Sequence, residues 1–176
     1  AQPYVVVDIE TTGGNSSYNR ITEIGMVKLV GGKEVDRFQT LLNPQRRIPS
    51  NITRLTGISD DMVANAPIFA EVAEHVAGFT EDAVFVAHNV NFHYGFIKQE
   101  FARLEQTFRR PKMCTVREMR RTYPGLPSYS LANLTRHFHI DMEQHHRALS
   151  DAKAAAELLK LAFEKDDELV GISSNT

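Results

Sequence analysis

An apolar, β-branched run near the start of the chain ends in two acids. Residues 4–9 read YVVVDI, a pattern typical of a buried strand, and Asp8 and Glu10 stand at its end. Side chains two positions apart on a strand share a face, ~7 Å from each other. Two carboxylates there cost free energy unless a cation lies between them, and a hard divalent cation prefers oxygen ligands. The pair predicts a metal site, although an exposed strand end would also fit these two acids alone.

The rest of the pattern predicts strands first and then helices interleaved with short strands. Gly31-Gly32 is a tight-turn signal between two of the strands, and residues 43–52 read as an irregular, proline-punctuated connection. This order predicts an α/β domain with a mixed central sheet and flanking helices on both faces. The expected strands are 4–9, 21–30, 33–42 and 83–87, and the expected helices are 59–64, 67–78, 92–106, 131–138 and 148–164.

Composition fits one intracellular domain. The chain has 176 residues, of which 42% are hydrophobic and 24% charged, and we expect a domain at 1–165 followed by an acidic, then flexible tail at 166–176. Its apolar runs fall short of the ~20 residues that span a membrane. The single cysteine, Cys114, excludes an internal disulfide and fits a reducing, cytoplasmic setting.

Positive charge is concentrated in the middle of the chain, although the net charge is only -2. Between residues 98 and 121 there are more basic than acidic side chains, which fits a surface that follows a phosphate backbone. A solvated helix face fits the same pattern equally well. The basic residues are Lys98, Arg103, Arg109, Arg110, Lys112, Arg117, Arg120 and Arg121.

A third acid comes from the last expected helix. His146 stands at the helix entry and Asp151 lies about one and a half turns inside it, followed by several alanines that permit close packing on the sheet. An acid on the packed side of this helix needs a partner, and the expected site at Asp8 would supply one. For this segment alone, a simpler interpretation is that Asp151 interacts favourably with the positive N-terminal end of the helix dipole.

Together, three segments resemble the exonuclease motifs of the DEDDh group of 3′→5′ exonucleases. They are DIETTG at residues 8–13, HNVNF at 88–92 and HRALSDA at 146–152. The connection at 43–67 is similar to the corresponding segment of proofreading, epsilon-type exonuclease domains of bacterial DNA polymerase III. The resemblance covers residues 4 to about 162 and implies an RNase H-like fold.

The resemblance also implies the chemistry, which is metal-assisted hydrolysis of a phosphodiester. Two Mg²⁺ or Mn²⁺ ions, about 3.5–4 Å apart, would hold the attacking water and the leaving 3′-oxygen. Asp8 would bridge both ions, and Glu10 and Asp151 would complete the site. His146 would be the general base, a role that suits an imidazole with its ordinary pKa of ~6.5. The product would be a nucleoside 5′-monophosphate.

The same resemblance implies residues that contact the substrate, a single-stranded 3′ end with DNA favoured over RNA. The glycine turn after Glu10 would lie against the terminal nucleotide, and apolar groups would wedge or stack on bases with little sequence preference. Ser128, Tyr129 and Ser130 precede a helix start where phosphate binding is a further option. The expected substrate-binding residues are Thr11, Thr12, Gly13, Leu55, Thr56, His88, Asn89 and Phe92.

Position 93 departs from the family pattern, because His93 stands where a fourth carboxylate is expected. Imidazole is a poor ligand for Mg²⁺, and a protonated ring would repel the metal. Three accounts stay open: an inactivating substitution, a variant that retains activity with Asp8 and water at the second metal, and a transition-metal site. We expect His93 to weaken the second metal site and to lower turnover.

Two other functions also fit the sequence. One is a non-catalytic, nucleic-acid-binding module associated with a DNA polymerase or with a larger polypeptide. The other is a 3′→5′ exoribonuclease, since these enzymes share the motifs. No membrane partner is expected.

Overall fold

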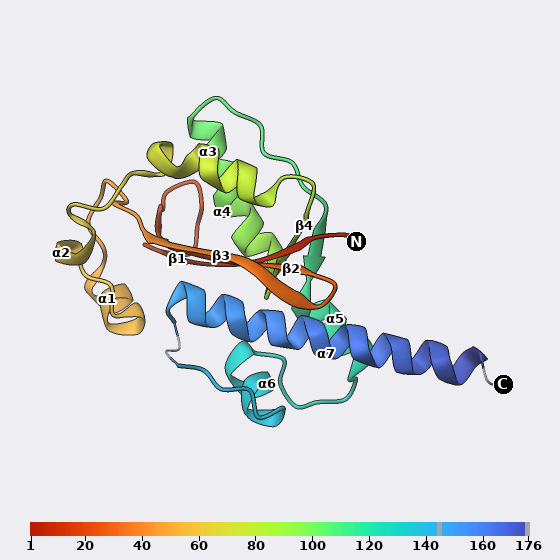
Figure 1. Ribbon diagram of the computed structural model, residues 1–176. Helices are drawn as coiled ribbons and strands as arrows, with labels where there is room; N and C mark the ends of the chain where they lie inside the picture. The colour runs from red at the N-terminus through yellow and green to blue at the C-terminus, as the bar shows by residue number, and fades with distance from the viewer. Residues whose placement is uncertain (144–145, 175–176) are drawn as a thin grey trace.

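The described residues form a five-stranded mixed sheet with helices on both faces (Figure 1). The computed structural model describes the backbone of residues 1–143 and 146–174 and, of these, the side chains up to residue 168. The strand order is β3-β2-β1-β4-β5. The strands are β1 (Tyr4–Thr11), β2 (Ile21–Val30), β3 (Lys33–Leu41), β4 (Val84–Ala87) and β5 (Lys112–Cys114).

Strands β1, β2 and β3 pair antiparallel to one another in chain order, whereas β4 pairs parallel to β1 and β5 pairs parallel to β4. Gly31 and Gly32 both have positive φ, 60° and 77°, which the tight turn between β2 and β3 requires. Asp8 pairs with Gly25 and Glu10 with Glu23 across the β1–β2 ladder, and the register shifts directly after Glu10. The end of β1 therefore bends away from regular pairing at the two acids.

Two apolar layers hold the helices on the sheet. The side chains of β1 alternate between them, with Val5 and Val7 facing α3 and α4 and Val6 facing α7. On the α7 side, small side chains let the helix approach closely, among them Ala152, Ala155 and Ala156. The helices are α1 (Ser50–Thr56), α2 (Asp60–Val63), α3 (Phe69–Thr80), α4 (Val90–Arg103), α5 (Thr115–Thr122), α6 (Leu131–His137) and α7 (Ala148–Ser174).

The predicted α/β class, mixed sheet and two-sided helix packing are confirmed, while several elements differ. The connection predicted at 43–52 contains the start of α1, and neither β5 nor α5 was predicted. Helix α7 continues through the expected boundary at residue 165 to Ser174, and Asp166 forms an ion pair with Arg121 of α5 at 2.8 Å. Residues 166–174 thus continue a helix where a flexible tail was expected. None of the helices in the described residues is long and apolar enough to cross a membrane.

Candidate active site

Three carboxylates from two elements meet at the end of β1. Asp8 and Glu10 come from the strand, and Asp151 comes from the first turn of α7, which crosses the sheet at this point. Each offers an oxygen, and these oxygens all lie within 4.8 Å of one another. The sequence predicted this set of acids, and the structure brings them together.

Burial and mutual repulsion hold protons on these acids. Burial, together with the charges of Asp8 and Asp151, raises the pKa of Glu10 to about 10. Burial and the charge of Asp8 raise the pKa of Asp151 to about 8, although a hydrogen bond from the His146 backbone opposes the rise. The Oδ2 atom of Asp8 is buried and has no hydrogen-bond partner among the described residues. Oxygen ligands that cannot all ionise without a counter-charge fit a hard divalent cation.

His93 reaches the same centre from the first turn of α4. Its Nε2 lies 3.0 Å from Asp8 Oδ1, and its Nδ1 lies 3.0 Å from the carbonyl oxygen of Asn89. Because a carbonyl only accepts hydrogen bonds, Nδ1 carries a proton. The contact between Nε2 and Oδ1 then needs a second proton, either on the ring or on the carboxyl. Burial would lower the pKa of His93, but the hydrogen bond and charge of Asp8 outweigh burial and raise it.

The imidazole therefore lies where the sequence expected a carboxylate, and it brings a proton with it. Its hydrogen bond uses a lone pair of Asp8 Oδ1 that a second cation would need. The three carboxylates offer oxygen ligands that suit a divalent cation, and His93 adds beside them a nitrogen, which Mg²⁺ binds poorly.

A buried acid on β2 fixes the start of α7. Glu23 is 1% exposed and accepts two hydrogen bonds from the guanidinium of Arg147, at 3.0 and 2.8 Å. It also accepts one from the backbone N–H of Ala148, at 2.9 Å. Gly25 lies beneath the same turn, where an added Cβ would come within 2.4 Å of Leu149 N. Sequence reasoning missed this contact, although an acid and a glycine inside an apolar strand were the available signals.

His146 precedes this turn with a left-handed backbone, φ 63°. Its charge acts to lower the pKa of Asp8, which burial raises, so the imidazole lies near the carboxylates. The Glu23–Arg147 contact thereby positions both His146 and Asp151, one on each side of it in the chain.

The turn after Glu10 is held by its own hydrogen bonds. Thr11 Oγ1 donates to the carbonyl of Gly13 at 2.8 Å, and Thr12 Oγ1 donates to Asn19 Oδ1 at 2.9 Å. A Cβ on Gly13 would lie 2.6 Å from Asn19 Oδ1, so a larger residue there would have to move the Asn19 side chain that Thr12 binds.

The other predicted substrate residues divide into exposed and internal groups. Leu55 and Phe92 are 56% and 39% exposed, so both side chains are accessible for base stacking. Thr56 is buried, and its hydroxyl donates to the Ile52 carbonyl at 3.0 Å.

His88 and Asn89 stand at the start of α4 in different surroundings. Asn89 is exposed, with a left-handed φ of 71°. Both ring nitrogens of His88 are used inside the protein, at 2.7 Å from Thr115 Oγ1 and from the Tyr129 carbonyl. His88 therefore links the start of α4 to Thr115 and Tyr129 through both of its ring nitrogens.

Comparison with known proteins places these features in a family. The exonuclease model of the RNase T family matches residues 5–159. The chain is 44% identical over 169 residues to a PolC-type DNA polymerase III of Clostridium perfringens, covering 96% of the chain and 12% of that protein. It is 36% identical to the 3′-5′ exonuclease DinG of Staphylococcus epidermidis, covering 94% of the chain and 18% of that protein. The chain thus spans only about an eighth of the length of its PolC-type relatives.

Solved structures share the backbone arrangement. Escherichia coli exonuclease I in complex with a dT13 oligonucleotide superposes with a TM-score of 0.86 at 17% identity, over 98% of this chain and 43% of that one. Exonuclease X in complex with 5′ overhanging duplex DNA gives a TM-score of 0.73 at 27% identity, over 92% and 91% of the two chains. The predicted RNase H-like fold is confirmed. With its motifs in place along residues 5–159, the chain belongs to the RNase T-type exonuclease family, as the resemblance to DEDDh exonucleases predicted.

Proposed function

We propose that this chain is a metal-dependent 3′→5′ exonuclease that releases nucleoside 5′-monophosphates from single-stranded 3′ ends. The observation that carries the proposal is the cluster of Asp8, Glu10 and Asp151, whose oxygens lie within 4.8 Å of one another in a chain of the exonuclease family. DNA is favoured over RNA because the relatives include DNA polymerases of the PolC type.

Each residue has a distinct task in this proposal. Asp8, Glu10 and Asp151 would hold Mg²⁺ or Mn²⁺, which supplies charge neutralisation at the phosphate and a lowered pKa for water. His146, beside Asp8, would accept the proton of the attacking water as phosphorus is attacked and the 3′-oxygen leaves. Thr11, Thr12 and Gly13 would hold the terminal nucleotide through backbone that is already fixed.

Two cations are expected from the family pattern, and we propose that His93 weakens the second site. The ring occupies Asp8 Oδ1 with a hydrogen bond of 3.0 Å, so a second cation has to displace it together with its proton. Manganese would tolerate this nitrogen neighbour better than magnesium, because affinity for nitrogen ligands rises along the transition series.

Exposed apolar side chains support a single-stranded substrate. Leu55 and Phe92 offer surfaces on which bases of any identity can stack. One solved neighbour with this fold holds a dT13 oligonucleotide, whereas another holds a 5′ overhanging duplex, in which the 3′ end is recessed and paired.

The second candidate is a binding module of a polymerase with little or no cutting activity. The contact between His93 and Asp8 favours it, since this contact fills part of the metal centre. The chain's match to 12% of a PolC-type polymerase fits attachment to a larger polypeptide in either case. An exoribonuclease differs from the main proposal only in the sugar that it accepts.

A labelled-oligonucleotide assay tests the proposal. A 5′-labelled single-stranded DNA should give a ladder shortened from its 3′ end in Mn²⁺, with RNA of the same sequence cut more slowly. Asp8→Ala should abolish the ladder by removing an oxygen ligand. Binding without shortening in Mg²⁺ and in Mn²⁺ would favour the non-cutting module, and cutting that survives in Asp8→Ala would show that the site is elsewhere.

A further inference from the structure

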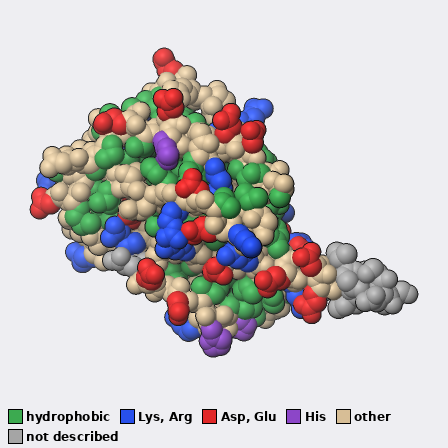
Figure 2. Space-filling model, in the orientation of Figure 1, with side chains coloured by type: hydrophobic (Ala, Val, Ile, Leu, Met, Phe, Trp, Pro, Cys, Tyr) green, Lys and Arg blue, Asp and Glu red, His purple; other side chains and the backbone are tan. Residues whose placement is uncertain are grey.

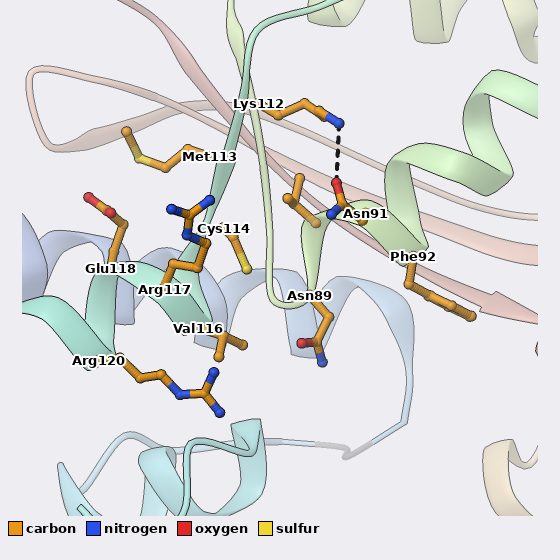
Figure 3. Close-up of a pocket in the computed structure, with 11 residues that line it drawn as sticks. Asn89, Asn91, Phe92, Lys112, Met113, Cys114, Val116, Arg117, Glu118 and Arg120 are labelled. Atoms are coloured by element: carbon orange, nitrogen blue, oxygen red, sulfur yellow. Dashed lines mark hydrogen bonds between the residues drawn. The ribbon is translucent and has the colours of Figure 1, made fainter. Parts of the chain in front are cut away.

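A groove lined by basic residues lies between the start of α4 and helix α5 (Figure 3). Its volume is about 670 Å³, which is ample for a nucleotide-sized ligand. Lys112 of β5 and Arg117 and Arg120 of α5 line one side, and Asn89 and Phe92 at the start of α4 line the other. We call this the α4–α5 groove.

Within the described part of the chain, Lys112, Arg117 and Arg120 of the α4–α5 groove form no ion pair with an acid. Lys112 donates to the neutral amide of Asn91 at 3.1 Å, and Arg120 lies over the Tyr129 ring at 5.3 Å from its centroid. The acid that lines the groove, Glu118, pairs with Arg121 at 3.0 Å. The groove thus contains an acid as well as cations, but this acid is paired with Arg121, and the exposed cations of the groove can bind an anionic ligand.

Two other hollows of the described structure carry acids beside their cations. Arginines in the hollow at α1 are accompanied by Asp60 and Asp61. The hollow beside the β2–β3 turn combines two lysines with Glu164, Asp166 and Asp167. On the face shown in Figure 2, Lys and Arg side chains lie interleaved with Asp and Glu. The α4–α5 groove therefore suits a polyanion better than these surfaces do.

The groove leads away from the cutting site. Phe92 stands at its edge and is next in the chain to His93, whose ring contacts Asp8 at 3.0 Å. A second hollow of about 570 Å³ shares Asn89, Val116 and Arg120 with the groove and continues to Ser128 and Ser130. A strand whose 3′ end lies at the carboxylates can leave along this path.

Arg117 and Arg120 are three positions apart on α5, so their side chains share one face of the helix, roughly 5–6 Å apart at Cβ. Two guanidinium groups spaced along a path can each contact a phosphate without reading a base. We propose that the α4–α5 groove binds the phosphates of the substrate strand upstream of the two nucleotides at the 3′ end. This inference rests on the proposed exonuclease function, and it adds a surface that binds longer substrate strands more tightly than short ones.

A charge-matched pair of double variants tests the groove. Arg117→Gln with Arg120→Gln removes two groove cations, while Arg37→Gln with Arg109→Gln removes two exposed cations that do not line it. Affinity for labelled dT12 is measured by fluorescence anisotropy in EDTA from 50 to 200 mM salt. The groove variant should bind on the order of tenfold more weakly at 100 mM, with a salt slope shallower by roughly 1.4. The control should match the unmodified protein, and thermal melting checks that both variants fold.

Hydrolysis separates failure of the groove from failure of the proposed function. With Mn²⁺, the groove variant should lose rate on dT12 and retain it on a dinucleotide, which is too short to reach α5. An equal loss on both substrates, or unchanged binding of dT12, would overturn the proposed role of the groove. Absence of hydrolysis of both dT12 and the dinucleotide by the unmodified protein would reject the exonuclease function while leaving the anisotropy test of the groove intact.

Discussion

His88 and His93 lie on either side of the first residues of α4, and their surroundings move their pKa values in opposite directions. Burial lowers the pKa of His88 to about 4, so its ring is neutral at pH 7 and serves as a link between Thr115 and Tyr129. The charge of Asp8 raises the pKa of His93 against the effect of burial. One histidine is a neutral brace and the other brings a proton to the site.

The pKa of His88 makes stability depend on pH. Its folded pKa of about 4 lies below the ordinary value of 6.5, so the unfolded chain binds more protons between these values. The stabilisation is present above pH 6.5 and is lost as pH falls toward 4. For this group alone we expect a free energy of unfolding roughly 2 kcal/mol lower at pH 5 than at pH 7.

Urea denaturation of the protein and of His88→Gln at both pH values isolates this contribution. Glu10 and Asp151 act in the opposite direction, because their raised pKa values cost stability as pH rises, but they are common to both proteins. The variant should show a smaller loss between pH 7 and pH 5. A loss equal to that of the unmodified protein would mean that His88 does not titrate in this way.

At the scale of elements, the contact between β2 and α7 decides the geometry of the site. Glu23 binds the turn at Arg147 and Ala148, and Gly25 lets the helix backbone lie directly on the strand. The helix delivers Asp151, and the strand beneath is the ladder partner of β1, which delivers Asp8 and Glu10. A shift of α7 relative to β2 therefore moves Asp151 relative to Asp8 and Glu10.

Two Gly→Ala substitutions make a matched test of the contact between β2 and α7. In Gly25→Ala the new Cβ would lie 2.4 Å from backbone and force α7 outward, which should cost about 2–3 kcal/mol and lower the Tm by several degrees. Gly95→Ala, inside α4, meets nothing within 4 Å and should raise stability by about 0.5–1 kcal/mol. Differential scanning calorimetry measures both. Equal effects of the two substitutions would contradict the close approach of α7.

The elements that sequence predicted are those with a clear period. The β-branched run of β1, the turn at Gly31-Gly32 and the alanine-rich α7 each follow from local chemistry. The three-residue β5 is too short for any period, and α5 begins directly after it in a strongly basic segment. Their pairing comes from tertiary contacts that a local pattern does not contain.

Some residues of the candidate site could also be predicted from the sequence, whereas other contacts of the site are visible only in the fold. Asp8 and Glu10 were predicted from spacing on one strand, and Asp151 from family resemblance together with the small residues after it. The Glu23 contact joins residues 124 positions apart, and the contact of His93 with Asp8 joins residues 85 positions apart. A single sequence shows that position 93 departs from the pattern, but only the fold shows which carboxylate oxygen the imidazole takes.

For the whole molecule, the two-sided sheet places every part of the proposed chemistry at one end of β1. Helix α4 brings His93 from one face and α7 brings Asp151 from the other. The α4–α5 groove then extends this site along the surface. The chain corresponds to about an eighth of the length of its PolC-type relatives.

The measurement that tests the account most directly compares the protein with His93→Asp and His93→Asn on a single-stranded oligonucleotide, in Mg²⁺ and in Mn²⁺. The aspartate restores an oxygen ligand and frees Asp8 Oδ1, whereas the asparagine of similar size adds no charge. We expect His93→Asp to cut roughly 10–100-fold faster than the unmodified protein, with the larger gain in Mg²⁺ and with His93→Asn gaining much less. Equal rates of the histidine and aspartate proteins in both metals would contradict the account.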